Sequence, residues 1–189
     1  MSTPAAHVMA GLTYYLATEP VPAPRRDWQR LVFFSILSIL PDLDFLPVFL
    51  LGFERANRLH HTYTHTLGFA VAAAIIIAPM WWRWRGGSLW RRAIDVFSLQ
   101  ALHLLVDSLT RDTRPPIGSM VFWPLSKTYV IAPVQVFMGV YKPNLAGVFS
   151  LYNVLSVMMD ILVVSVPMVL ILALRGGAWR GRLHGGRAG

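Results

Sequence analysis

The chain of 189 residues contains no cysteine, which excludes disulfides, thiolate metal sites and a cysteine nucleophile. Charged residues are also scarce: they make up 14% of the chain, whereas a soluble domain carries about 25%. Hydrophobic residues make up 55% and fall in long runs, which indicates a membrane protein. Residues 1–9 lack the basic and apolar pattern of a cleavable signal peptide.

The basic residues are unevenly distributed along the chain. The net charge is +8, and eleven of the 17 Lys and Arg residues lie in the segments 18–30, 83–92 and 175–189. Each of these segments flanks an apolar run, as cytoplasmic anchors do under the positive-inside rule. We therefore expect these segments and the C-terminus to be cytoplasmic, and no nucleic-acid partner.

The apolar runs predict a helical membrane protein. Helices are expected at 4–17, 31–53, 67–82, 93–109 and 148–174. The fold class is thus all-α and polytopic, with about five membrane-embedded helices, one of them broken at Pro41. We expect one domain over residues 1–174 and a basic, disordered tail over 175–189. The protein is predicted to lie in the inner (plasma) membrane, with the polar connections 54–66 and 110–147 facing outward.

His103 and Asp107 form the strongest local pair of metal-binding residues. A spacing of four residues places them on one face of a helix, close enough to bind one cation. Polar groups on a membrane helix avoid lipid, because a central charge costs about 2.5–3.5 kcal/mol on insertion scales. The pair therefore either binds a metal or forms a buried hydrogen bond that holds helices together.

Asp42 and Asp44 lie in the run Pro41-Asp42-Leu43-Asp44 within an apolar segment. Carboxylates two residues apart point to different faces of a regular helix, but Pro41 disrupts the preceding turn. A broken helix at membrane depth is tolerated where it lines a cavity or is buried in protein, so both carboxylates can face one site. The alternative is a simple helix end at the interface, with an Asp as cap.

A third cluster, at residues 60–66, contains His60, His61 and His65. Imidazole is a good ligand for zinc and related metals. The alternative is a solvated interfacial loop. In the predicted topology, the candidate ligands from four separate segments meet near the outer face: His7, Asp42, Asp44, His60, His61, His65, His103 and Asp107.

Other polar residues complete this hypothesis. Arg111 and Arg114 follow the helix that carries His103, and Arg58 precedes the histidine cluster. Their guanidinium groups can bind a phosphate, or pair with lipid headgroups. Asp160 lies within the last apolar run, where we expect it to hydrogen-bond a neighbouring helix.

Taken together, these motifs resemble the membrane-bound metal-dependent hydrolase family, the YdjM-like inner-membrane proteins. The similarity covers about residues 7–124 and includes an early His, a Pro-Asp-x-Asp element, a His-rich element and a His-x-x-x-Asp element followed by Thr110. His61 stands where the family usually has Arg, so either His60 or His61 can be the ligand. The family distantly resembles zinc-dependent phospholipases C, which implies phosphoester hydrolysis.

The sequence therefore predicts a metal-dependent hydrolase that acts on a phosphate-bearing or amphiphilic, lipid-linked substrate at the outer membrane surface. Zinc is the first expected metal, with manganese or iron as alternatives. Asp42 or Asp44 is expected to accept a proton from water. Two other functions remain open: a divalent metal or ion transporter that uses the same ligands, and a non-enzymatic membrane scaffold whose polar residues pack helices.

Overall fold

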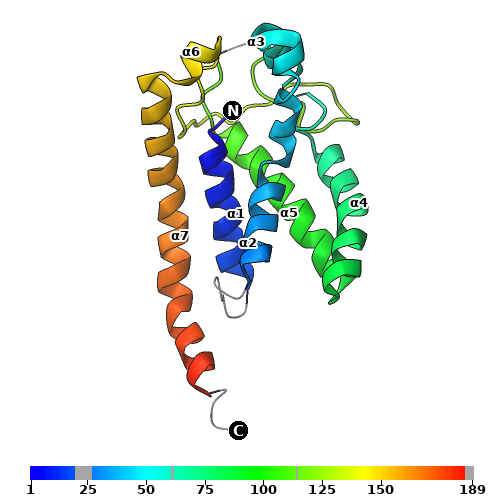
Figure 1. The fold of residues 1–189 in the computed structure, drawn as a ribbon, viewed down its shortest axis with the longest axis vertical. Coiled ribbons are helices and arrows are strands. Elements are labelled where there is room, and N and C mark those ends of the chain that lie inside the picture. The colour runs from blue at the N-terminus through cyan, green and yellow to red at the C-terminus, as the bar shows by residue number, and fades with distance from the viewer. Residues whose placement is uncertain (20–26, 61, 114, 186–189) are drawn as a thin grey trace.

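The computed structural model describes residues 1–19, 27–60, 62–113 and 115–185, with side chains as far as Gly176. No strand occurs in these ranges, so the all-α prediction is confirmed. The helices are α1 Pro4–Thr18, α2 Trp28–Ser38, the 3₁₀ helix η1 Leu40–Phe45, α3 Val48–Leu59, α4 Leu67–Arg85, α5 Leu89–Ser108, α6 Leu145–Val148 and α7 Leu151–Gly185 (Figure 1).

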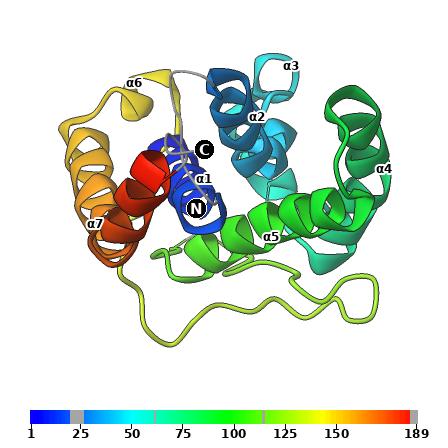
Figure 2. The same cartoon turned by 90° about the horizontal axis from the view of Figure 1, so that it is seen from below.

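Helix α1 lies in the middle of the bundle, in contact with α2, α5 and α7 (Figure 2). Pro4 starts the helix where its missing N–H costs nothing. Thr3 caps the first turn, because its hydroxyl accepts a hydrogen bond from the amide of Ala6 at 3.4 Å. Gly11 allows close packing on α2, since a Cβ there would lie 2.8 Å from Ser38 Oγ. This central helix carries His7 on its first turns.

The predicted helix break at Pro41 is present. Helix α2 ends at Ser38, and residues 40–45 form the short 3₁₀ helix η1 before α3 begins at Val48. Helix α3 extends to Leu59, so part of the expected polar connection 54–66 is helical. Gly52 has φ +75° and kinks α3, which separates its apolar start from its polar end.

Helices α4 and α5 form an antiparallel pair. Thr66 caps α4 by accepting a hydrogen bond from the amide of Phe69 at 2.9 Å, and Ser88 caps α5 in the same way. The backbone amides of Leu67 and Gly68 bind the carbonyls of Val121 and Trp123 at 2.8 and 3.2 Å. The long connection after α5 thereby fixes the start of α4, directly after His65.

The two ends of the helical bundle are formed by different segments of the chain. One end holds the start of α1, η1, α3, the end of α5 and α6; the other holds the α4–α5 connection and the C-terminal end of α7 (Figure 1). The connections 54–66 and 110–147, predicted to face the same side of the membrane, therefore lie at the same end of the bundle (Figure 1).

Two of the described helices are long and apolar enough to cross a membrane, residues 67–85 and 151–176, where about five were expected. Helix α1 has 15 residues, a length of about 22 Å, whereas the hydrocarbon core is about 30 Å thick. Helix α2 is shorter still, at 11 residues. Helix α7 is described as far as Gly185, within the segment 175–189 where a disordered tail was expected. Residues 186–189 lie outside the described residues.

Candidate metal centre

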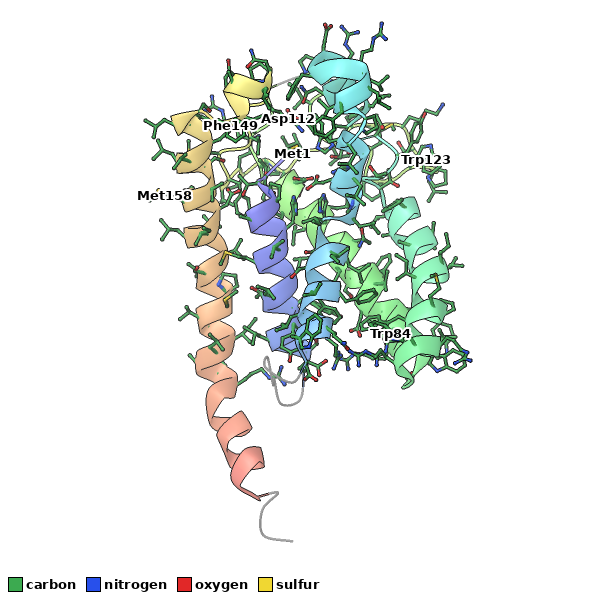
Figure 3. The ribbon with its side chains drawn as sticks, in the orientation of Figure 1. Met1, Trp84, Asp112, Trp123, Phe149 and Met158 are labelled. Carbon is green, nitrogen blue, oxygen red and sulfur yellow. The ribbon has the colours of Figure 1, made fainter. Side chains whose placement is uncertain are left out.

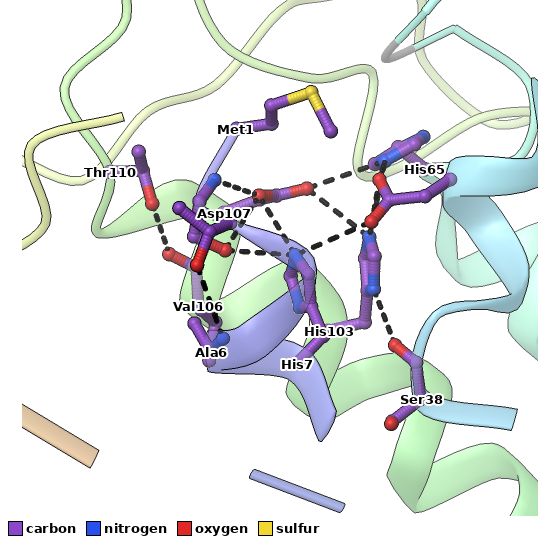
Figure 4. Close-up of polar contacts among 12 residues, drawn as sticks. Met1, Ala6, His7, Ser38, His65, His103, Val106, Asp107 and Thr110 are labelled. Atoms are coloured by element: carbon purple, nitrogen blue, oxygen red, sulfur yellow. Dashed lines mark hydrogen bonds and ion pairs between the residues drawn. The ribbon is translucent and has the colours of Figure 1, made fainter. Parts of the chain in front are cut away.

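Side chains from four segments meet at one end of the bundle. His7 comes from α1, Asp42 from η1, His60 and His65 from the α3–α4 connection, and the last two from α5, His103 and Asp107. The four imidazoles and Asp107 are buried, and Asp42 keeps 11% of its side chain exposed. Figure 4 shows His7, His65 and His103 arranged around the Asp107 carboxylate. The convergence predicted from the sequence is thus present.

These residues form two groups that share Asp42. One contains His7, Asp42, His103 and Asp107, and the other contains Asp42, His60 and His65. Within each group, one ligand atom per residue lies within 4.8 Å of every other. A carboxylate common to both groups is the arrangement expected where a carboxylate bridges two metal ions.

The distances inside the cluster fit the coordination of a cation. His103 Nε2 lies 3.2 Å from Asp107 Oδ2, and His65 Nε2 lies 3.3 Å from the same oxygen and 3.4 Å from Asp42 Oδ1. Ligand atoms bound at about 2.0–2.2 Å around a tetrahedral ion are themselves about 3.3–3.6 Å apart. The cluster therefore has the dimensions of a metal site.

Asp42 provides a second test of that fit. Both of its carboxylate oxygens are buried, and neither makes a hydrogen bond within the described residues. Oδ1 instead faces Nε2 atoms of His65, His103 and His60 at 3.4, 3.6 and 3.8 Å. A buried carboxylate without hydrogen bonds is costly, and a metal ion would offset that cost. The residues present therefore fit a divalent cation.

A backbone carbonyl fixes the orientation of the His103 ring. Its Nδ1 donates a hydrogen bond to the carbonyl of Ser38 at 2.7 Å, and a carbonyl can only accept. In the neutral ring, Nε2 therefore keeps a lone pair directed into the cluster. His7 stacks on His103 with ring centroids 3.7 Å apart, which holds both rings in place. Such support of a ligand by a backbone carbonyl is typical of metal-binding histidines.

Asp44 plays a different part from Asp42. Its Oδ1 lies 2.5 Å from His60 Nδ1, and its Oδ2 lies 3.4 Å from His65 Nδ1 and accepts a hydrogen bond from Thr64 Oγ1 at 2.7 Å. Asp44 therefore binds the outer nitrogens of two histidines, which turns their Nε2 atoms toward Asp42. In the structure Asp44 belongs to neither candidate ligand group and contacts the outer ring nitrogens of two candidate ligands. The sequence analysis counted it among the ligands.

The pKa values of the two histidines of this connection are shifted in opposite directions. Burial alone would lower the pKa of His65, but Asp107, Asp42 and Asp44 raise it well above its ordinary value. Burial lowers the pKa of His60 well below its ordinary value, and the nearby Lys142 ammonium lowers it further. Without a metal, His65 therefore binds a proton more tightly than His60 does.

The first residues of the chain are part of the cluster, which the sequence analysis missed. The Ser2 amide donates to Asp107 Oδ1 at 2.9 Å, and Ser2 Oγ lies 2.8 Å from His7 Nε2. The Thr3 amide donates to Asp160 Oδ2 at 2.8 Å. Asp160 on α7 thus holds the start of α1, consistent with the expected hydrogen bond to a neighbouring segment. Only contacts distant in sequence reveal this role of Ser2.

The arginines predicted to bind substrate lie in different places. Arg58 is exposed and forms an ion pair with Glu54 one turn earlier in α3, at 2.6 Å. Arg111 lines a cavity that also contains His60. Arg114 and His61 lie outside the described residues. Among the described arginines of this prediction, Arg111 is the one that lies beside the cluster.

Comparison with known proteins identifies the family. No curated protein and no solved structure matches the chain. The resemblance to metal-dependent hydrolases and phospholipases C has no counterpart among these comparisons and stays a prediction. The model of the YdjM inner membrane protein family matches residues 1–181, and its name agrees with the two candidate membrane spans in supporting a membrane location. The chain therefore belongs to the YdjM inner membrane protein family.

Proposed function

We propose that this protein is a membrane-embedded, metal-dependent hydrolase of a phosphoester or lipid-linked substrate at the outer membrane surface. The observation that carries the proposal is the pair of His/Asp groups that share Asp42. In support, both buried oxygens of Asp42 lack a hydrogen bond within the described residues and face imidazole nitrogens at 3.4–3.8 Å, where a cation could bind between them.

The residues divide into two candidate ligand sets. His7, Asp42, His103 and Asp107 would hold one divalent ion, and Asp42, His60 and His65 a second. The four imidazoles favour zinc, and the three carboxylates of the region leave manganese or iron as alternatives. When bound, such an ion supplies Lewis acidity and lowers the pKa of a coordinated water toward about 7.

Asp42 is the proposed proton acceptor. Both oxygens of Asp44 already contact His60, His65 or Thr64. Asp42 Oδ2 makes no hydrogen bond in the described residues, and it lies 3.8 Å from His7 Nε2. If Asp42 served both ion sites through Oδ1 alone, its Oδ2 would remain able to take a proton from water.

Membrane position supports an amphiphilic substrate. The cluster lies at the end of the bundle opposite the basic α4–α5 connection (Figure 1). If the basic end is cytoplasmic, as the positive-inside rule predicts, the cluster faces outward. A lipid-linked substrate could then bring its head to the cluster while its tail stays in the membrane.

The proposal is tested by metal analysis of the purified full chain, followed by hydrolysis assays. His103→Ala is expected to lower the metal content and to abolish turnover of phosphomonoester, phosphodiester or phospholipid substrates in metal add-back assays. His184→Ala, near the C-terminal end of α7, is the matched control and should leave both unchanged. Stoichiometric metal without turnover, but with metal uptake into proteoliposomes, would indicate a transporter. Absence of metal would indicate a scaffold.

A further inference from the structure

A cavity of about 320 Å³ lies beside the metal centre. His60 belongs both to its wall and to the candidate ligands, so a molecule in the cavity contacts the centre directly. Met1 and Asp112, two further lining residues, lie between the start of α7 and α3 (Figure 3). Asn57 on α3 donates to the carbonyl of Lys142 at 3.0 Å, which joins α3 to the opposite wall.

The charged side chains of the described lining are mainly cationic. They are Arg111, Lys142 and Asp112, which gives a net positive charge. Asp112 Oδ2 accepts a hydrogen bond from the amide of Gly118 at 2.9 Å, so this carboxylate is engaged by its own loop. The electrostatics of the cavity therefore favour an anion.

Lys142 is held next to the metal centre. It is 8% exposed, and its Nζ lies 4.0 Å from the centre of the Phe45 ring. The same ring contacts the His60 imidazole edge to face at 5.8 Å. The ammonium and the imidazole thus flank one aromatic side chain, and the charge of Lys142 lowers the pKa of His60. A buried ammonium fixed in this way is a preorganised anion ligand.

The size of the cavity limits what enters it. A volume of about 320 Å³ is at the lower limit of the 300–1,000 Å³ of small-molecule sites, roughly the room of a polar headgroup. Apolar residues around the α6–α7 junction are exposed outside it: Leu145 at 63%, Phe149 at 80% and Leu151 at 73%. Tyr152, on the same turn of α7, lines the cavity. A cavity lined by two cations, next to an exposed apolar surface, fits a lipid with an anionic head.

We propose that Lys142, with Arg111, forms a subsite for the phosphate head of a membrane lipid and holds that head against His60. The tail of the lipid lies over Leu145, Phe149 and Leu151. This assignment rests on the proposed function only in calling the lipid a substrate. Binding itself requires the cavity and its two cations.

The test measures lipid binding by native mass spectrometry of the metal-loaded full chain in detergent. The probes are phosphatidic acid, diacylglycerol with the same chains, and inorganic phosphate. Lys142→Met is expected to weaken phosphatidic acid binding at least about tenfold, because truncating one partner of a buried charge pair is costly. Lys127→Met, an exposed lysine outside the described cavity lining, is the matched control and should bind as wild type. Lys142→Arg should restore binding, and metal content should stay unchanged in all three variants.

Each outcome decides the proposal. Equal phosphatidic acid affinity in Lys142→Met and Lys127→Met overturns the subsite, as does equal binding of phosphatidic acid and diacylglycerol. If inorganic phosphate binds as tightly as phosphatidic acid, the lipid assignment is wrong. If Lys142→Met does not fold, Lys142→Gln and Lys142→Arg are compared, and equal affinity again overturns the subsite. Lysine-dependent lipid binding without any hydrolysis would reject the proposed function and leave the subsite intact.

Discussion

Helix α5 carries two buried aspartates about three turns apart, and they meet different partners. Asp95, toward the basic end, accepts hydrogen bonds from Arg91 Nε and the Tyr14 hydroxyl, both at 3.0 Å. Asp107, at the other end, accepts the Ser2 amide and faces imidazoles of His7, His65 and His103 at 3.2–3.4 Å. One helix therefore carries the same acid in two chemical settings.

The partners decide what each aspartate can do. A guanidinium stays protonated at all relevant pH values and has no lone pair for a metal, so Asp95 and Arg91 form an ion pair within α5. The Tyr14 hydroxyl then joins Asp95 to α1. An imidazole can exchange its proton for a metal ion near neutral pH, so the surroundings of Asp107 can become a coordination sphere. A buried acid indicates a metal site only where its neighbours can lose protons.

The largest expected effect comes from exchanging each acid for its amide. Asp107→Asn is expected to lower metal affinity more than about 100-fold, because it removes a charged ligand atom and not a supporting group, whose loss costs about 10–100-fold. Asp95→Asn should keep its metal and lower the melting temperature, because it leaves Arg91 without its buried carboxylate. Metal content by elemental analysis and thermal unfolding in detergent measure the two effects. If Asp95→Asn lost its metal and Asp107→Asn kept it, the assignment of Asp107 to the metal site would be wrong.

Asp44→Asn is expected to have the next largest effect. It weakens the hold on the outer nitrogens of His60 and His65 without removing a ligand. Loss of such support typically costs about 10–100-fold in metal affinity. Glu54→Gln is the matched control, because Glu54 is an exposed carboxylate on α3 that pairs with Arg58. Titration with zinc would measure the affinities, and equal values for the two variants would show that Asp44 neither binds the metal nor supports its ligands.

Local patterns predicted much of this site, and contacts distant in sequence supplied the rest. The i, i+4 spacing of His103 and Asp107 and the helix break at Pro41 depend on backbone geometry, which residues a few positions apart determine. The role of Ser2 depends on packing of the chain start against α5, and that of Lys142 on the path of a long connection. No periodicity encodes such contacts. The sequence also predicted about five membrane-embedded helices, of which two have the length and hydropathy of a span. The run 31–53 was expected as one helix broken at Pro41, and it is divided into α2, η1 and α3, so α2 has 11 residues.

The proton on His65 predicts how metal affinity depends on pH. The raised pKa means that metal-free His65 is protonated near neutral pH, and a metal must displace that proton. Affinity should therefore rise with pH, by up to about tenfold per unit while one proton is released. The stability of the metal-free protein should change with pH in the opposite direction. The contribution of protonated His65 to the free energy of unfolding is fully present below about pH 6.5, and it is lost as the pH rises through the raised pKa of His65. Zinc titrations and melting curves across this range check both signs, and an affinity independent of pH would contradict them.

Asp160 gives the smallest expected effect, because it acts on the centre only through the start of α1. Its Oδ2 accepts the amide of Thr3, next to Ser2. Asp160→Ala leaves a buried amide without its acceptor and should cost about 1–3 kcal/mol of stability. Because Ser2 then loses part of its support beside Asp107, metal affinity should also fall a few-fold.

Asp160→Asn separates hydrogen bonding from charge at this position. The asparagine carbonyl can still accept the Thr3 amide, so its melting temperature and zinc affinity should stay close to those of wild type. If Asp160→Asn instead loses metal as severely as Asp107→Asn, the charge of Asp160 contributes to the centre itself. Asp160 would then resemble Asp107, as an acid whose negative charge helps to bind the metal. It would not resemble Asp95, which only accepts hydrogen bonds within the fold.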